Sequence, residues 1–294
     1  MLGWRVGRAT ITPVVEVDAV TSPRFLFSDF GKADVIDLAQ RVPWLAPHFV
    51  DERGYLVQRI QCLVIDIDGT RIAVDTCVGN DKVRANPGWH DLHGPFLADL
   101  ADAGFPPESI DAVVCTHLHV DHVGWNTRLV DGHWLPTFPD ARYVLAGTEV
   151  DYWQRTAYPD DDPIFADSVA PVLDAGLADL VAVDHRVTDS IRFDPTPGHT
   201  PGHVSVVVES GGERAVITGD MIHTPVQIAA VERSSAFDYD STAAAQTRRD
   251  FLERYSDGTL VIGTHWGGPG AGRIIADGEG GWVLQTVEAG VTSA

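Results

Sequence analysis

The chain has 294 residues, 44% of them hydrophobic and eight of them Trp, so it contains enough apolar material for a sizeable core. Asp and Glu number 42 against 21 Lys and Arg, which gives a formal charge of −21. A surface with this charge repels phosphate backbones and anionic lipid headgroups, so nucleic acid and membranes are not expected as partners. A small-molecule substrate is compatible with it.

The first 56 residues precede the first convincing core hairpin of the chain. Their most apolar part is Trp44-Leu-Ala-Pro-His-Phe-Val50, for which two roles are open. It is either a hydrophobic lid over a cleft, with Trp44 and Phe49 facing a substrate, or an ordinary packed segment. Residues 1–56 are therefore expected to be an N-terminal elaboration of the domain that follows.

Targeting signals and reactive thiols are not apparent in the sequence. Residues 1–8 contain no continuous apolar run with a small-residue cleavage pattern, and no stretch approaches the ~20 apolar residues of a membrane span. The chain has three cysteines without a Cys-x-x-Cys spacing, and they are predicted to be reduced core residues: Cys62, Cys77 and Cys115. We expect a cytoplasmic protein and leave a homo-oligomer open.

Strands and helices are predicted along most of the chain. Two strands at residues 61–67 and 71–75 flank Asp68-Gly69, which predicts a hairpin with a tight turn. Apolar residues at helical spacing, ended by a glycine, predict a helix from Pro95 to Gly104. Further strands are expected within residues 190–210 and at 213–218, and a second helix at 241–255.

The most informative feature is the run Thr116-His-Leu-His-Val-Asp-His122, which directly follows a short apolar stretch at residues 111–115. In an extended segment side chains alternate between faces, so His117, His119 and Asp121 are predicted to project to one side. A turn at Asp121 would bring His122 to the same place. Imidazole and carboxylate are ligands for Zn, Fe, Mn or Co, so the run predicts a two-metal site at the end of a buried strand.

Three further candidate ligands lie far apart in sequence, each after an apolar run or beside a Pro-Gly turn: His199, Asp220 and His265. Together with the first four they make seven nitrogen and oxygen donors. Donors spread over residues 117–265 must converge in space, so this span cannot be divided into independently folded halves. We therefore predict one domain over residues 1–294.

In order and local context these seven residues resemble the metallo-β-lactamase superfamily, whose pattern is His-x-His-x-Asp-His, then Gly-His, Gly-Asp and a late His. The resemblance implies an α/β fold, a four-layer αββα sandwich with the metals at one edge between the sheets. It also implies a residue that orients ligands without binding metal, which is Asp75 here.

The same resemblance implies how the donors are divided between two divalent transition metal ions, with Zn expected and Fe, Mn or Co as alternatives. One metal would be bound by His117, His119 and His199. The other would be bound by Asp121, His122 and His265, with Asp220 bridging both and Asp121 counted among the catalytic residues as well. A water bridging the metals would be activated as hydroxide for attack on an electrophile.

A proton donor to the leaving group is also required, and His223 is the candidate. It lies three residues after Asp220, where N-acyl homoserine lactonases of this superfamily carry a Tyr. The form Gly-Asp-x-x-His at residues 219–223 resembles methyl parathion hydrolase-like members instead. His223 is thus either an acid near the metals or a structural residue, and His203 is predicted to be a buried partner of the Pro-Gly loop.

Four aromatic residues are predicted to line a substrate pocket and to favour neutral substrates with an apolar or aromatic moiety: Trp44, Phe49, Trp125 and Trp266. The predicted function is a dinuclear zinc hydrolase acting on a small organic substrate such as a lactone, ester or organophosphate. Three alternatives remain open. They are a dehalogenase or β-lactamase-type hydrolase on the same site, a persulfide dioxygenase with a single iron, and a noncatalytic metal-binding module.

Overall fold

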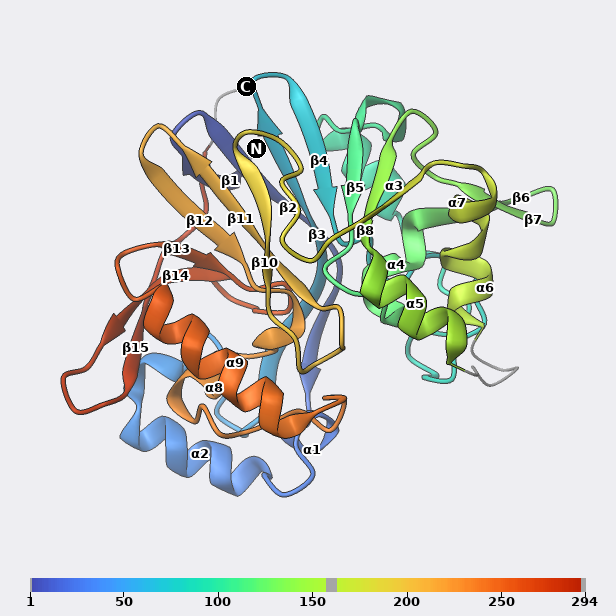
Figure 1. The fold of residues 1–294 in the computed structure, drawn as a ribbon. Helices are drawn as coiled ribbons and strands as arrows, with labels where there is room; N and C mark the ends of the chain where they lie inside the picture. Colours follow the sequence, from blue (N-terminus) through green and yellow to red (C-terminus); the bar gives the residue numbers. More distant parts are fainter. Residues whose placement is uncertain (1, 157–162, 292–294) are drawn as a thin grey trace.

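Two β-sheets pack face to face in the computed structural model, which describes residues 2–156 and 163–291, and helices cover their outer faces (Figure 1). The larger sheet has eight strands in these residues, in the order β16-β1-β2-β3-β4-β5-β8-β9. Their bounds in that order are Gly290–Val291, Leu2–Val6, Ala9–Thr21, Leu56–Ile67, Thr70–Val74, Ala112–Val114, Arg142–Ala146 and Ala178–Val181.

The smaller sheet has six strands in the same described residues, in the order β10-β11-β12-β13-β14-β15. Their bounds are Ile191–Pro195, Val204–Ser210, Glu213–Ile217, Leu260–Ile262, Ala271–Ala276 and Trp282–Thr286. A separate ribbon pairs β6 and β7, at Thr127–Val130 and His133–Pro136.

The α-helices are mostly short, and they fall into two groups that lie against different sheets (Figure 1). In chain order α1 to α9 span Pro23–Leu26, Lys32–Arg41, Phe96–Asp102, Val120–Val123, Gly147–Arg155, Ile164–Ser168, Ala170–Asp174, Val226–Ala229 and Ser241–Arg254. Single 3₁₀ turns, η1 to η4, lie at Pro43–Leu45, Pro107–Ser109, Gly124–Asn126 and Gly219–Met221. Among the described residues, no helix has both the length and the apolar character that crossing a membrane demands.

Alternating side chains of the strands divide the core into layers. In β3, Cys62 and Val64 pack toward α3 on the outer face, whereas Leu63 and Ile65 pack inward against the other sheet. The outer face of the smaller sheet packs on α9 through Phe251. Three apolar layers between four layers of secondary structure confirm the predicted αββα sandwich.

The predicted hairpin and both predicted helices are present. Ile67 pairs with Thr70 across the two-residue turn Asp68-Gly69, in which both residues have positive φ, as the tight hairpin turn requires. Helix α3 is slightly shorter than predicted. Helix α9 begins after Asp240, whose carboxylate accepts hydrogen bonds from the backbone N–H groups of Thr242 and Ala243.

Part of the N-terminal segment is built into the larger sheet. Strand β1 pairs with β2, and β2 pairs with β3 along its length, so residues 2–21 belong to the larger sheet. Residues 23–50 form a separate apolar cluster with Leu56 and Val226. Trp44 is half-buried at its border, and the lid role of this segment stays a prediction.

All three cysteines are buried and free, as predicted. Burial raises the pKa of each thiol above its ordinary value, so these side chains stay protonated at neutral pH.

Candidate metal centre

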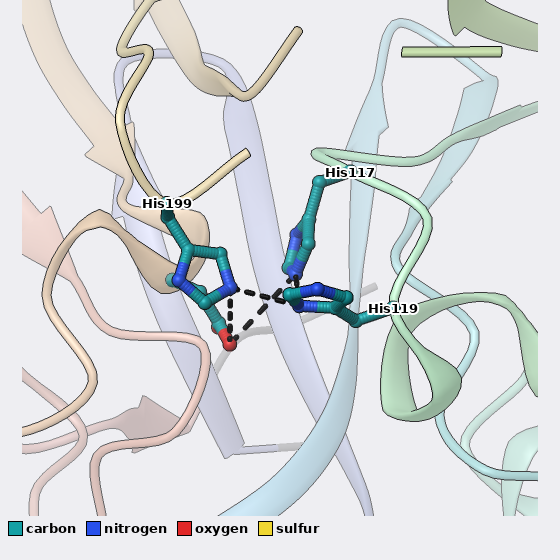
Figure 2. Close-up of side chains that lie close together, drawn as sticks. His117, His119 and His199 are labelled. Carbon is teal, nitrogen blue, oxygen red and sulfur yellow. Dashed lines mark hydrogen bonds and ion pairs between the residues drawn. The ribbon is translucent and has the colours of Figure 1, made fainter. Parts of the chain in front are cut away.

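The seven predicted ligands meet at one edge of the sandwich, between the two sheets. Strand β5 ends at Val114 and delivers the loop with His117 and His119, while parallel strands β12 and β13 end just before Asp220 and His265. His199 lies in the loop between β10 and β11. Figure 2 shows the imidazoles of His117, His119 and His199 pointing toward one another.

The segment after β5 converges in a different way from the prediction. It is not extended through Asp121, because the strand ends at Val114 and the short helix α4 starts at Val120. A bend at residues 116–119 and the first helical turn bring the four side chains together. The predicted alternation along a strand was therefore wrong in detail, although the donors do converge.

A first cluster consists of three imidazoles and one carboxylate oxygen. Nδ1 of His119 lies 3.0 Å from Nε2 of His117 and 2.8 Å from Nε2 of His199. Oδ2 of Asp220 lies 3.8 Å from the same atom of His117 and 3.6 Å from that of His199. Four donors therefore surround one point.

A second cluster consists of His122, His265 and Asp121. The two Nε2 atoms lie 3.2 Å apart, and Asp121 oxygens lie 3.6 Å and 3.4 Å from those of His122 and His265. Oδ1 of Asp220 lies 3.3 Å and 3.0 Å from the same two nitrogens. Asp220 thus presents one oxygen to each cluster, as a bridging ligand would.

Hydrogen bonds on the far side of the rings fix the tautomers in the first cluster. His199 donates through Nδ1 to Oδ1 of Asp238 at 2.9 Å. Thr116 donates its hydroxyl to Asp75, so its oxygen accepts from Nδ1 of His117 at 3.1 Å. Each Nε2 that faces the cluster therefore carries a lone pair rather than a proton.

The second cluster is arranged in the same way. His122 donates through Nδ1 to Oδ2 of Asp75 at 2.9 Å, which is the orienting role expected for Asp75. His265 donates through Nδ1 to the carbonyl of Arg59 at 2.9 Å. Both Nε2 atoms then point into the second cluster, where a positively charged group, a proton or a metal ion, would lie between them.

The protonation states of the histidines also bear on whether the two clusters fit metal ions. Burial, with neighbouring histidines, holds the pKa of His117 and His199 well below the ordinary value, so both stay neutral. Burial also lowers the pKa of His265, but Asp220 and Asp121 outweigh it and raise that pKa to about 9. The carboxylates thus favour a positive charge in the second cluster. Converging lone pairs and buried carboxylates fit transition metal ions at both clusters.

The predicted acid His223 lies beside the clusters. Its Nε2 is 3.3 Å from Oδ2 of Asp220, and its Nδ1 is buried and has no hydrogen-bond partner among the described residues. His203 has a supporting role, as predicted. Its Nδ1 contacts the hydroxyl of Thr196 at 2.9 Å, and its Nε2 accepts from the backbone N–H of Asp220 at 2.9 Å.

Three of the four predicted pocket residues lie in the core. Trp125 stacks on Phe96 and donates its indole N–H to Glu16, and Trp266 donates to the carbonyl of Ile222. Phe49 is fully buried and contacts Trp266. These contacts give all three a packing role, and their contact with substrate stays a prediction, as does that of Trp44.

Aromatic side chains other than Trp44, Phe49, Trp125 and Trp266 lie near the clusters. The ring of Trp153 is 5.1 Å from that of His119. Its neighbour Tyr152 contacts Tyr239, which is 64% exposed and whose backbone N–H donates to the carbonyl of His199. Phe237 is 45% exposed in the same loop.

Two buried acids were also missed, Asp238 and Glu149. Both contact ligand-bearing segments that are distant in sequence. A carboxylate in the first turn of a helix, or in a loop, carries no local signal for such contacts. An Asp between two aromatic residues, as at 237–239, was the available hint for Asp238.

Comparison with known proteins places this arrangement in a family. The family model described as the metallo-beta-lactamase superfamily matches residues 57–265. The chain is 25% identical to an N-acyl homoserine lactonase of Bacillus sp over 165 residues, which are 51% of this chain and 58% of that relative. It is 30% identical to a probable metallo-hydrolase, YflN, of Bacillus subtilis (strain 168), over 45% of this chain and 58% of the relative. The chain thus matches less than two thirds of the length of these curated relatives.

Solved structures match over nearly the full chain. A hydrolase of the beta lactamase superfamily, AbOPH, has a TM-score of 0.79 at 23% identity and covers 99% of this chain and 98% of its own. AidC, a dizinc quorum-quenching lactonase in complex with a product, has a TM-score of 0.77 at 17% identity with the same coverage. At these identities the likeness shows the fold alone. Because the family model spans more than half of its residues, the chain belongs to the metallo-beta-lactamase superfamily.

Proposed function

We propose that this protein is a dinuclear metal hydrolase, with Zn as the expected metal, that cleaves a small organic lactone, ester or organophosphate. The observation that carries the proposal is the pair of donor clusters that share Asp220, one carboxylate oxygen facing each. Two divalent metals bound there would lower the pKa of a water toward neutrality and polarise an oxygen of the substrate. Relatives named as lactonases and hydrolases support the class of reaction.

The side chains around the clusters orient the imidazoles and supply a proton donor. Asp75, Thr116 and Asp238 hold the imidazoles with their lone pairs inward, so little reorganisation is needed when substrate binds. His223 lies beside Asp220, and its Nε2 faces the first cluster. We assign to His223 the donation of a proton to the leaving group or the clamping of a substrate oxygen.

The substrate is proposed to contain an apolar or aromatic moiety. Tyr239 and Phe237 flank Asp238, so two exposed aromatic side chains border the ligand His199. Phe237 contacts Phe25 at a ring distance of 5.1 Å, and Phe25 is 41% exposed. Exposed aromatic side chains grouped beside a metal centre favour an apolar group on the ligand.

The test combines metal analysis with a substrate panel. Purified protein should contain close to two equivalents of transition metal per chain, measured by mass spectrometry. Aryl esters, lactones, organophosphates, β-lactams and halogenated aromatics are then compared. Tyr239→Ala should raise KM for substrates with apolar groups, whereas Leu180→Ala, at another exposed apolar position, on β9, should leave KM unchanged. One iron per chain with oxygen consumption on a persulfide would refute the hydrolase.

A further inference from the structure

A buried glutamate in α5 contacts both loops that carry the first cluster. Glu149 is 1% exposed and lies three residues into the helix. Its Oε1 accepts from the backbone N–H of Leu118 at 3.1 Å and from the indole N–H of Trp153 at 2.6 Å. Its Oε2 accepts from the backbone N–H of Gly202 at 2.9 Å.

Each of these three donors is directly connected to a histidine. Leu118 separates His117 from His119 in the chain, so its peptide sets the direction of both side chains. Gly202 is in the loop that carries His199. The Trp153 ring packs against His119 at 5.1 Å. One carboxylate therefore joins the segments that supply all three imidazoles of the first cluster.

The approach of the His199 loop to α5 is too close for any side chain at position 202. A Cβ on Gly202 would lie 2.4 Å from the backbone nitrogen of Glu149 and 2.8 Å from its Cα. Such contacts force a shift of the loop. The distance between α5 and the His199 loop therefore depends on two features. One is the carboxylate of Glu149, and the other is the lack of a side chain at Gly202.

These hydrogen bonds stabilise the carboxylate of Glu149 in its buried position. Burial raises the pKa of Glu149, while Trp153, Leu118 and Gly202 lower it by donating to the charged form. A buried carboxylate is tolerated when charge-assisted hydrogen bonds replace its water. Removal of the charge should therefore loosen all three contacts at once.

We infer that Glu149 is a positioning residue that holds the loops of the first cluster at the separation a metal requires, and this inference rests on the proposed function. It reaches the cluster through the peptides of Leu118 and Gly202 and through the indole of Trp153. In the second cluster Asp75 has the corresponding role, but directly on the ring of His122. The effect of Glu149 is therefore confined to the metal bound by His117, His119 and His199.

Glu149→Gln tests this with Glu16→Gln as a matched control. Glu16 is a half-buried acid with the same set of donors: it accepts from two backbone N–H groups, those of Val78 and Gly79, and from one indole, that of Trp125. None of these donors lies in a loop of the first cluster. The full chain is loaded with Co²⁺ alone and dialysed against increasing chelator, and retained cobalt and its visible absorption spectrum are recorded.

One of the two cobalt equivalents should be lost from Glu149→Gln at about 10- to 100-fold lower chelator concentration, the usual cost of removing a residue that orients ligands. The spectrum of that equivalent should change. Glu16→Gln should lose this cobalt equivalent at the same chelator concentration as the wild type. In a His265→Ala background, which disables the second cluster, Glu149→Gln should weaken the remaining cobalt by the same factor.

Glu149→Gln could instead retain both cobalt equivalents as the wild type does and show a fall in melting temperature like that of Glu16→Gln. Glu149 would then be a buried hydrogen-bond acceptor with a structural role alone, and the inference would be overturned. If Glu149→Gln does not fold, Gly202→Ala is used, and the same selective loss is expected. A wild type that binds two cobalt ions but hydrolyses no substrate refutes the proposed function alone. A wild type that binds no cobalt refutes both.

Discussion

Asp238→Ala should weaken metal binding at the first cluster without unfolding the protein. The variant removes the acceptor for Nδ1 of His199, a charge-assisted hydrogen bond of 2.9 Å. Such bonds contribute about 1.5–3 kcal/mol, which at about 1.4 kcal/mol per tenfold corresponds to a loss of about 10- to 150-fold in affinity. Removing a residue that orients a metal ligand typically lowers metal affinity about 10- to 100-fold, which agrees with this range. The loss arises because the ring of His199 can then rotate or change tautomer.

The assay is chelator competition on the metal-loaded chain, with Asp240→Ala as control. Asp240 lies two residues away in the same loop, but its carboxylate caps α9 rather than contacting a histidine. Its removal should lower the free energy of unfolding by about 1 kcal/mol and leave metal affinity unchanged. Asp238→Asn keeps an acceptor oxygen and should fall between Asp238→Ala and wild type. Equal affinity in Asp238→Ala and wild type would refute the claim that this carboxylate sets the tautomer of His199.

Four further outcomes follow from the geometry. His119→Ala and Asp220→Ala should lose metal and activity together, and full turnover by either variant would exclude that residue from the site. His223→Phe should retain both metals yet lose about 10²- to 10⁴-fold in rate on substrates with poor leaving groups, and much less where the leaving group needs no proton; equal, negligible effects on both would make His223 structural. Metal removal should lower the melting temperature, since metals bind the folded state selectively, and a scan unchanged by chelator would contradict this. Gly124→Ala should cost about 3 kcal/mol or more in denaturant unfolding, because its Cβ would lie 1.8 Å from the carbonyl oxygen of Val78, whereas Gly147→Ala, with its nearest atom at 3.6 Å, should be tolerated.

The convergence of the seven side chains could be predicted because each candidate ligand stands in a short local pattern. A buried strand followed by several imidazoles and carboxylates has few structural explanations, and a hairpin such as residues 61–75 fixes its own register through the Asp68-Gly69 turn. Long-range packing was not needed for these inferences. The same locality explains why the sheet order and the helical start of α4 were not predicted.

The pocket prediction relied on proximity in sequence, and this is a poor guide to direction. Trp266 follows His265 directly, but the chain bends at residues 264–265 and the two side chains lie on different sides of it. Its ring therefore packs on Phe49 while His265 faces the second cluster.

Strand β2 was missed for a different reason. Pro13 argues against a central strand, but among the described residues β1 pairs with residues 9–11 of β2 and not with Pro13, so a missing N–H is tolerated there.

The position of the second cluster between the two sheets has a consequence for how the proposed metals would be acquired. His122 and His265 lie 143 residues apart in the chain, and they come from different sheets, yet their nitrogens are 3.2 Å apart. Contacts of such sequence separation form slowly, and neither half of the second cluster is a complete ligand set before the sheets dock. Under the proposed function, metal capture would therefore be a late event in folding. Ions bound there would connect one sheet to the other, so the rate of their release should limit how fast the sandwich opens.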